Sequence, residues 1–164
     1  MKWDLETDVV IAGYGLSGAV AAIEAHDGGA EVVVLEKSKY PGGCSILSGG
    51  MVVCARNADD AYKYLTITSG GRIGDDLIRQ MAEELAANEA YLTKLAESCG
   101  GSIRTTKAHE PGEKNDLGYI PLGYPFPGYE TFYRSGVAKV PGFDGFPWVQ
   151  ELNKTGVNIM KVVF

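Results

Sequence analysis

Residues 8–22 of this chain read DVVIAGYGLSGAVAA, and the fold follows from this stretch. A short apolar run leads into glycines and an alanine-rich segment follows directly, which predicts a strand, a tight turn and a helix. The glycines stand at positions 13, 15 and 18, in the spacing GxGxxG. A second apolar run, residues 31–35, ends in Glu36, eighteen residues after Gly18. This order of elements is the dinucleotide-binding fingerprint, so we expect a β-α-β unit that binds a dinucleotide.

Each residue of the pattern has a physical reason. Gly13 allows the chain to leave the strand in a sharp turn, and Gly15 leaves room for a pyrophosphate against the backbone. Gly18, with the small Ala22 four residues later, allows the helix to pack closely against the strands. The helix N-terminus offers N–H groups and a partial positive charge to phosphate oxygens. Glu36 can accept hydrogen bonds from a ribose diol and would repel a 2′-phosphate. The fingerprint alone leaves NAD and FAD open.

Composition and charge exclude several other classes of protein. The net charge is −6 and the basic residues form no cluster, so nucleic acid is not an expected partner. No apolar run approaches the roughly 20 residues of a membrane-spanning helix, and the N-terminus lacks an apolar signal core, so we expect a cytoplasmic protein. The three cysteines, Cys44, Cys54 and Cys99, form no Cys-x-x-Cys pair, which argues against a disulfide framework or a zinc site. We therefore expect no bound metal.

A second glycine-rich stretch, residues 37–51, reads KSKYPGGCSILSGGM. Two Gly-Gly pairs enclose Ser45 and Ser48, which suits a loop and helix start that press against a ligand and hydrogen-bond it. An NAD domain needs nothing here, whereas the longer FAD extends past the first loop. A solvated glycine loop is the alternative interpretation. It does not explain the apolar residues in and after the stretch, which are Ile46, Leu47, Met51, Val52 and Val53.

The fingerprint, the acid-terminated second strand and the segment Gly-Gly-x-Ser-x-x-Ser-Gly-Gly together resemble the flavoprotein family of fumarate reductases, succinate dehydrogenases and 3-ketosteroid dehydrogenases. The resemblance covers residues 6 to about 55 well and is looser to about residue 100. It implies an α/β fold: a Rossmann-like FAD-binding domain of the glutathione-reductase type, with a parallel sheet, followed by the start of a cap or substrate region. The respiratory members attach FAD through a histidine in the second segment. Residues 42–50 contain no histidine, so we expect non-covalent FAD.

The resemblance also implies which residues bind the cofactor. The pyrophosphate is expected at the first glycine loop, the adenosine ribose at the end of the second strand, and the ribityl chain and isoalloxazine beside the second glycine stretch. The expected FAD-binding residues are Gly13, Tyr14, Gly15, Leu16, Ser17, Gly18, Ala19, Glu36, Lys37, Gly42, Gly43, Cys44, Ser45, Ser48, Gly49 and Gly50. Cys44 has no nearby second cysteine to resolve a disulfide, so we interpret it as a small space-filling residue rather than a redox-active thiol.

Two helices are predicted next. Asn57 can cap a helix over residues 58–68, which Gly70-Gly71 ends. The longest helical pattern covers residues 75–98, and because Asn88 interrupts its apolar stripe, two shorter helices are an alternative. The predicted buried face consists of Ile78, Met81, Leu85, Leu92 and Leu95. The predicted solvent-exposed face, to which we assign no chemistry, carries Arg79, Glu83, Glu84, Glu89 and Lys94.

The rest of the chain changes in composition. Residues 102–118 are polar and predict a surface loop or the boundary of a second lobe. Residues 119–148 interleave aromatic residues with prolines, which predicts irregular structure, either the packed start of a cap domain or the wall of an apolar substrate pocket. We therefore divide the chain into an FAD-binding part, residues 1–101, and the start of a cap or substrate region, residues 102–164. By resemblance to ketosteroid dehydrogenases, where tyrosines take part in proton transfer, the candidate catalytic residues are Tyr124, Tyr129 and Tyr133.

Residues 153–164 begin an amphipathic helix that stops on an apolar residue without a cap. We therefore expect a fragment or one half of a split enzyme, completed by a second polypeptide or a missing C-terminal portion. The expected function is the FAD-binding part of an oxidoreductase that moves a hydride between flavin and an activated C–C or C=C bond of a small molecule. The alternatives are an NAD-dependent dehydrogenase and a non-catalytic subunit that holds FAD for a partner chain.

Overall fold

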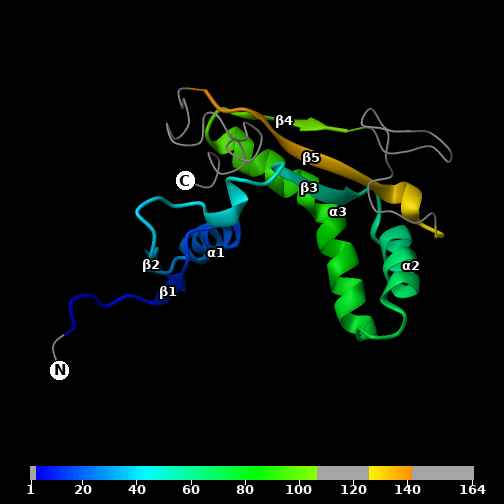
Figure 1. The fold of residues 1–164 in the computed structure, drawn as a ribbon, viewed down its shortest axis with the longest axis horizontal. Coiled ribbons are helices and arrows are strands. Elements are labelled where there is room, and N and C mark those ends of the chain that lie inside the picture. Colours follow the sequence, from blue (N-terminus) through cyan, green and yellow to red (C-terminus); the bar gives the residue numbers. More distant parts are fainter. Residues whose placement is uncertain (1–2, 107–125, 142–164) are drawn as a thin grey trace. The chain divides into compact units, whose positions relative to one another are not determined.

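The computed structural model describes residues 3–106 and 126–141 of the chain. The residues fall into two compact units, each of which is described by itself. The first unit is Met1–Gly50 with Val140–Phe164, and the second is Met51–Lys139. The first unit begins the ribbon in blue and cyan, and the second continues from cyan through green to orange (Figure 1). Tyr124 and the predicted helix 153–164 lie outside the described residues.

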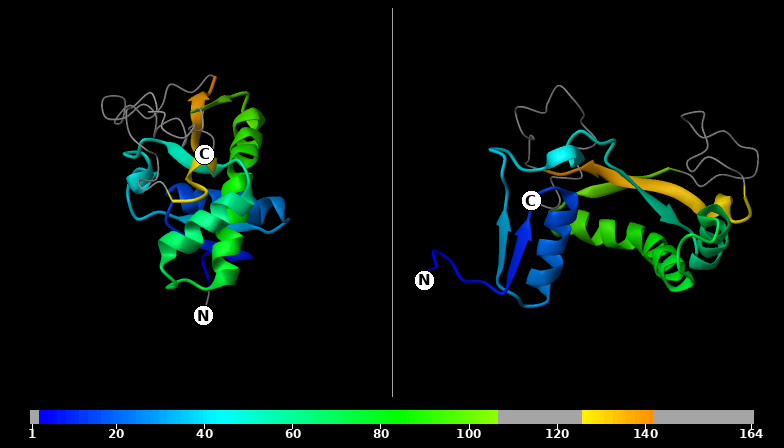
Figure 2. Two further views of the ribbon diagram at one scale, coloured as in Figure 1. Left: turned by 90° about the vertical axis from the view of Figure 1, so that its right-hand side faces the viewer. Right: turned by 60° about the horizontal axis from the view of Figure 1, so that its bottom comes forward.

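The first unit contains the predicted β-α-β arrangement. Strand β1 is Val9–Ala12, helix α1 is Leu16–Asp27 and strand β2 is Val32–Leu35. The two strands pair in parallel, with Val9 opposite Val32 and Ala12 opposite Leu35, and α1 lies against them (Figure 2). The prediction of strand, turn, helix and parallel strand is therefore confirmed.

The two faces of this small sheet differ. Ile11 points toward α1, because its Cγ2 atom would lie 3.4 Å from a Cβ built on Gly18. Val10 and Leu35 are 59% and 57% exposed. Among the described residues, the two strands therefore leave these apolar side chains exposed on the other face. The physical reason is the size of the sheet, since two strands and one helix cannot enclose both of its faces.

The second unit is a three-stranded antiparallel sheet with two long helices. Strand β3 (Met51–Ala55) and strand β4 (Ser102–Thr105) both pair with the central strand β5 (Phe132–Lys139), in the order β3-β5-β4. The sequence did not predict these strands, and the expectation of irregular structure throughout residues 119–148 was wrong for residues 132–139. Pro127 and Pro141 flank β5 rather than interrupt it, so every residue of the strand keeps its backbone N–H. The predicted boundary at residue 101 falls inside this unit.

The helices of the second unit follow the sequence closely. Helix α2 is Ala58–Ser69, capped by Asn57, whose Oδ1 accepts the Asp60 N–H at 2.8 Å. Helix α3, Asp75–Ser98, is continuous, so the alternative of a break at Asn88 was wrong. The Asn88 side chain donates to the Val53 carbonyl oxygen at 2.9 Å, which explains why a polar residue interrupts the stripe that faces β3.

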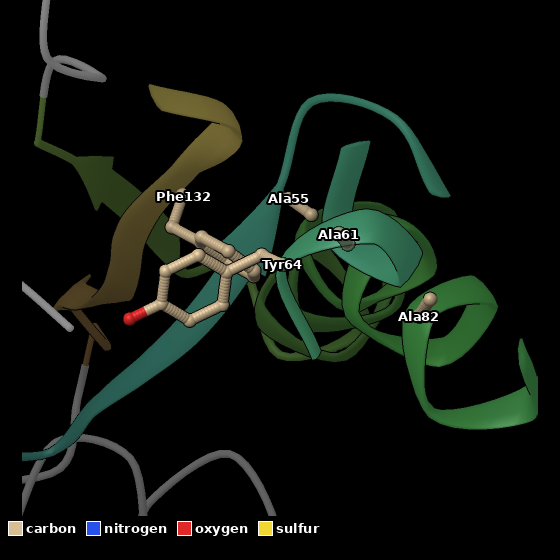
Figure 3. Close-up of a cluster of buried hydrophobic side chains, with 5 residues drawn as sticks. All are labelled: Ala55, Ala61, Tyr64, Ala82 and Phe132. Carbon is tan, nitrogen blue, oxygen red and sulfur yellow. The ribbon is translucent and has the colours of Figure 1, made fainter. Parts of the chain in front are cut away.

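A small core joins both helices to the sheet. Tyr64 and Phe132 meet edge to face, with ring centroids 5.1 Å apart. Three alanines complete the cluster and allow α2, α3 and β3 to approach one another closely (Figure 3). Its members are Ala55, Ala61, Tyr64, Ala82 and Phe132. The short 3-10 turn η2, Tyr129–Thr131, precedes β5, and its first residue, Tyr129, packs against the cluster.

The predicted apolar stripe of α3 is buried at Ile78, Leu92 and Leu95 but not at Met81, which is 50% exposed. Met81 lines an open apolar groove of about 590 Å³ between the ends of α2 and α3. The expectation that Met81 is buried was therefore wrong, because its side chain lines this open groove. The part of the chain that the structure describes has no helix that is both long and apolar enough to cross a membrane.

Candidate cofactor site

Two glycines of the fingerprint are required by the backbone itself. Gly13 has a φ of +103°, a left-handed conformation that favours glycine, and its N–H donates to the Leu35 carbonyl oxygen at 2.7 Å. A Cβ at Gly18 would overlap the Gly13 carbonyl oxygen and lie 3.1 Å from the carbonyl carbon. Gly18 therefore allows α1 to rest directly on the turn that follows β1, as its place in the fingerprint predicts.

Gly15 differs from both, because the fold does not require it to be glycine. Its φ of −85° and ψ of −175° are open to any residue. A Cβ here would meet the Ser45 Oγ at 3.7 Å and the Gly42 carbonyl oxygen at 3.8 Å, which are ordinary contacts. The absence of a side chain instead leaves free space in front of the α1 N-terminus. This space fits a ligand that approaches the backbone closely, as a pyrophosphate does.

The N-terminus of α1 faces this space. The first bond within the helix runs from the Ala19 N–H to the Gly15 carbonyl oxygen at 2.9 Å. The N–H groups of Leu16, Ser17 and Gly18 precede that bond and have no acceptor within the helix. They carry the positive end of the helix dipole, which suits an anion. The Leu16 N–H donates to the Ser45 Oγ at 3.1 Å.

Glu36, just after β2, is the residue predicted to bind the adenosine ribose, and it also holds the glycine loop. Its Oε2 accepts the Tyr14 N–H at 2.9 Å and its Oε1 accepts the Ser38 N–H at 2.8 Å. These bonds, that from Ser38 first, lower the pKa of Glu36 below its ordinary value, so the side chain is a carboxylate at neutral pH. The fingerprint indicated the ribose role but gave no signal for the bond to the loop.

The second glycine stretch lies against the first loop. The Gly42 N–H donates to the Tyr14 carbonyl oxygen at 2.7 Å, which joins the two glycine segments directly. Gly42 has a φ of +108°, and any Cβ there would overlap the Ile46 side chain that covers it. A short 3-10 turn, η1 (Gly43–Ser45), then places Ser45 at the start of α1. Segments separated by almost thirty residues in sequence therefore form one site.

The remaining residues of the predicted stretch differ in exposure. Gly42 and Gly50 are buried, whereas Lys37, Gly43, Cys44 and Gly49 are exposed. The Ser48 Oγ donates to the Ser45 carbonyl oxygen at 2.7 Å and accepts the Gly50 N–H at 3.1 Å. Ser48 thus shapes the end of the stretch through local backbone bonds. The exposed positions leave one side of the stretch open for contact with a ligand.

The candidate catalytic residues Tyr129 and Tyr133 belong to the second unit, whereas every predicted cofactor residue belongs to the first. Tyr133 is buried in β5, and its hydroxyl donates to the Glu89 carboxylate. Burial, reinforced by the neighbouring Glu89, raises the pKa of Tyr133, so the phenol stays protonated. Glu89 also accepts from the Thr105 hydroxyl at 3.0 Å. Glu89 is half-buried and bonded to two strands of the sheet, so the prediction that it belongs to the solvent-exposed face of α3 was wrong.

The geometry now defines a class of protein. A β-α-β unit with a glycine turn, an open helix N-terminus and a carboxylate at the second strand is a dinucleotide-binding domain, and the second glycine segment extends its site. Comparison with known proteins agrees, because a model of the family described as FAD binding domain matches residues 8–143. The chain belongs to this family. Its cofactor is FAD, as predicted, and the choice between NAD and FAD that the fingerprint left open is decided.

The chain is similar in sequence to proteins that are named as dehydrogenases and reductases. The chain is 31% identical over 154 residues to 3-oxo-5-alpha-steroid 4-dehydrogenase of Comamonas testosteroni, a match that covers 87% of this chain and 26% of the relative. It is 34% identical over 112 residues to the acrylate reductase flavoprotein subunit of Shewanella woodyi, covering 65% of this chain and 21% of the relative. The predicted resemblance to ketosteroid dehydrogenases and related reductases is confirmed. The chain spans about a quarter of the length of these relatives.

The fold is also found in a solved structure. The 3-ketosteroid-delta4-(5alpha)-dehydrogenase of Rhodococcus jostii RHA1 matches with a TM-score of 0.64 and 23% identity, over 99% of this chain and 36% of that protein. At this identity the likeness supports the fold alone. The predicted α/β class with a parallel sheet is confirmed by it.

Proposed function

We propose that the chain is the FAD-binding part of an oxidoreductase that acts on a C–C or C=C bond next to a carbonyl or carboxylate group. The observation that carries this proposal is the direct joining of the two glycine segments through the Gly42 N–H and the Tyr14 carbonyl oxygen. A site built from both segments is longer than a single glycine loop, which suits the two ends of FAD. When bound, FAD supplies a group that accepts or donates a hydride.

The residues of the chain then have distinct tasks in holding the cofactor. The N–H groups at the start of α1 bind the pyrophosphate, and the Glu36 carboxylate accepts from the adenosine ribose while it fixes the Tyr14 backbone. The stretch from Gly42 to Gly50 lies beside the ribityl chain and the ring. Cys44 is exposed within that stretch, and we retain it as a space-filling neighbour of the flavin.

The relatives support the substrate class. One is named as a dehydrogenase of an oxo-steroid and another as a reductase of acrylate, which is an unsaturated carboxylate. We therefore propose a small molecule in which the reacting carbons are activated by a neighbouring carbonyl or carboxylate. Tyr129 and Tyr133 stay candidates for proton transfer, together with Tyr124, which lies outside the described residues. A cytoplasmic location stays a prediction, which cell fractionation would test.

A non-catalytic FAD-holding subunit is the second candidate. The observation in its favour is coverage, because the chain spans 26% of the steroid dehydrogenase and 21% of the acrylate reductase subunit. In that case a partner chain, or a further portion of the same protein, would supply most of the catalytic residues.

Absorbance spectroscopy and thermal unfolding test the cofactor. The chain is purified gently, its visible spectrum is recorded, and its unfolding is followed with added FAD and with added NAD. We expect a flavin spectrum or a rise in the melting temperature with FAD alone. A colourless protein that FAD does not stabilise would refute the proposal.

The reaction is tested on the FAD-loaded chain. The bound flavin is reduced chemically under anaerobic conditions, and acrylate or an unsaturated 3-oxo steroid is added as a probe. Reoxidation of the flavin supports an oxidoreductase site within this chain. Flavin that stays reduced with both probes, and is reoxidised only after a second polypeptide is restored, supports the FAD-holding subunit.

A further inference from the structure

We propose that the groove between α2 and α3 is a docking site for a basic amphipathic helix of a partner protein. We call it the hairpin groove, because the two helices lie side by side and are joined by a short turn (Figure 1). Its volume is about 590 Å³. Its apolar lining consists of Leu65, Ile73, Leu77, Ile78 and Met81. The groove lies wholly in the second unit, so the proposal does not depend on the binding of FAD.

The apolar side chains of the hairpin groove are accessible to a partner. Leu77 is 57% exposed, Met81 50% and Ile73 45%. On α3, Leu77, Met81 and Glu84 stand at positions i, i+4 and i+7, so they form one stripe about 10 Å long. Helix-in-groove recognition places apolar anchors of the partner along a surface of this kind. The stripe therefore matches about two turns of an apposed helix.

The hydroxyl groups in the hairpin groove already donate within α2. The Thr68 hydroxyl donates to the Tyr64 carbonyl oxygen at 3.0 Å, and the Ser69 hydroxyl donates to the Thr66 carbonyl oxygen at 2.9 Å. A small-molecule site ordinarily combines an apolar lining with a few polar groups that converge on the ligand and orient it. Because both hydroxyl hydrogens are used by the helix backbone, this groove suits the apolar face of a helix better than a polar small molecule.

The edge of the hairpin groove on α3 is acidic. Asp76, Gln80 and Glu83 also stand at positions i, i+4 and i+7, so they form a second row beside the stripe of Leu77 and Met81. All three residues of this row are exposed. A carboxylate stands at each end of the row, next to the place where the flank of a docked helix would lie.

Among the described residues, the basic side chains near this edge leave it negative. The Arg79 Nη1 donates to Asp59 at 3.0 Å, and the Arg79 guanidinium lies 3.7 Å from the centre of the Tyr62 ring, so this charge is directed toward α2. Lys63 forms an ion pair within α2, and Arg72 adds one positive charge in the turn. A partner helix with Lys or Arg beside its apolar stripe is therefore attracted, whereas a second copy of this chain would bring the same acidic row to the groove.

The test uses the whole chain and two synthetic peptides of about 15 residues, a length at which a helix can form. Both peptides carry leucine at helical spacing, and the flanking positions are lysine in one and glutamate in the other. Fluorescence anisotropy of the labelled peptides measures binding. The lysine peptide should bind at least about tenfold more tightly than the glutamate peptide, and added salt should weaken its binding. Equal binding of the two peptides, or no binding of the lysine peptide up to about 1 mM, would overturn the proposal.

Matched variants separate docking in the groove from general attraction to a chain whose net charge is −6. Met81→Gln removes an apolar anchor and should weaken binding of the lysine peptide about fivefold, and Glu83→Gln removes a charge of the edge and should weaken it about two- to fivefold. The controls are Ile67→Gln, an apolar residue of α2 that is 44% exposed outside the groove, and Glu97→Gln, an exposed acid near the end of α3. Neither control should change the affinity. Unchanged binding in both groove variants, or equal losses in the controls, would contradict docking in this groove.

Sedimentation of the free chain tests a second copy as the occupant. We expect Met81→Gln to leave the oligomeric state unchanged, because the acidic row disfavours self-association through this face. A dimer that Met81→Gln dissociates would assign the hairpin groove to a second copy and overturn the proposal. The melting temperatures of all four variants should stay within about 2 °C of the wild type, since the substituted residues are exposed.

Discussion

Gly18 is required by the fold of the loop, whereas Gly15 is expected to face the ligand. The substitution Gly18→Ala tests the first of these roles. A Cβ at Gly18 would overlap the Gly13 carbonyl oxygen and lie 3.4 Å from the Ile11 Cγ2. Because the first obstacle is backbone, α1 has to move away from the turn as a body. Overpacking of this kind costs about 1–3 kcal/mol and sometimes more, while Gly→Ala within a helix returns about 1 kcal/mol. Since the overlap is with a backbone carbonyl oxygen, the cost should lie at the upper end of this range, and we expect a net loss of about 2 kcal/mol.

The matched variant is Gly15→Ala. Its Cβ meets atoms at 3.7 and 3.8 Å and its φ of −85° suits alanine, so the FAD-free protein should lose only about 0.5 kcal/mol. The methyl group nevertheless occupies the space in front of the α1 N-terminus. Displacing a pyrophosphate from one charge-assisted bond costs roughly 10- to 150-fold in affinity. The two substitutions are chemically identical, yet one should affect the fold and the other the binding of FAD.

Two measurements check this pair. Thermal unfolding of the FAD-free variants should show a fall of about 4–8 °C for Gly18→Ala and of at most about 2 °C for Gly15→Ala. Titration with FAD should show the large loss of affinity for Gly15→Ala. Wild-type stability of Gly18→Ala would refute the packing of α1 against Gly13, and wild-type FAD affinity of Gly15→Ala would refute the placement of the pyrophosphate.

Three further predictions concern single side chains. Glu36 has a folded-state pKa below its ordinary value of 4.5, so its contribution is complete above that value and is lost as the pH falls through the lowered pKa. The melting temperature of the wild type should therefore fall more steeply below pH 4.5 than that of Glu36→Gln, and parallel curves would contradict the bonds to the loop. Tyr133→Phe removes a donor from Glu89 and should cost about 1–2 kcal/mol in denaturant unfolding without changing FAD affinity; lost turnover at unchanged stability would instead favour a catalytic tyrosine. Phe132 is 1% exposed and packs on Tyr64, so Phe132→Ala should cost about 3–5 kcal/mol, and a loss under 1 kcal/mol would mean that this cluster is not a core.

The first unit could be predicted from sequence because its signals are local. Within fifteen residues the chain has an apolar run, a glycine with a left-handed φ and the start of a helix. Because these neighbours constrain one another's geometry, Gly13 and Gly18 are enough to predict the turn. The second glycine stretch was found for the same reason. What the pattern did not contain was the partner of each polar atom. Nothing near Glu36 in sequence indicates that its carboxylate holds the Tyr14 N–H.

The second unit shows the limit of local patterns. Both helices were predicted, since apolar spacing and the Asn57 cap are properties of neighbouring residues. The strands were missed because β3 and β4 become strands only by pairing with β5, which lies far along the chain. Asn88 and Glu89 were misread for the same reason, because their partners lie on those strands. A helical pattern in the sequence predicts which face of the helix is buried. It does not predict which polar atoms of other elements will bond to the residues on that face.

The pairing of β3 with β5 sets an order for folding during synthesis. Asn57, just after β3, donates its N–H to the Thr131 hydroxyl, 74 residues later. A ribosome adding about 5–20 residues per second needs several seconds to make that stretch, so β3 waits as an unpaired apolar segment. The β-α-β unit and the helical hairpin need no such delay, because their contacts are close in sequence. The nascent chain should therefore complete its glycine loops first and close the antiparallel sheet last, and the exposed edge of β3 is where a chaperone would bind in the interval.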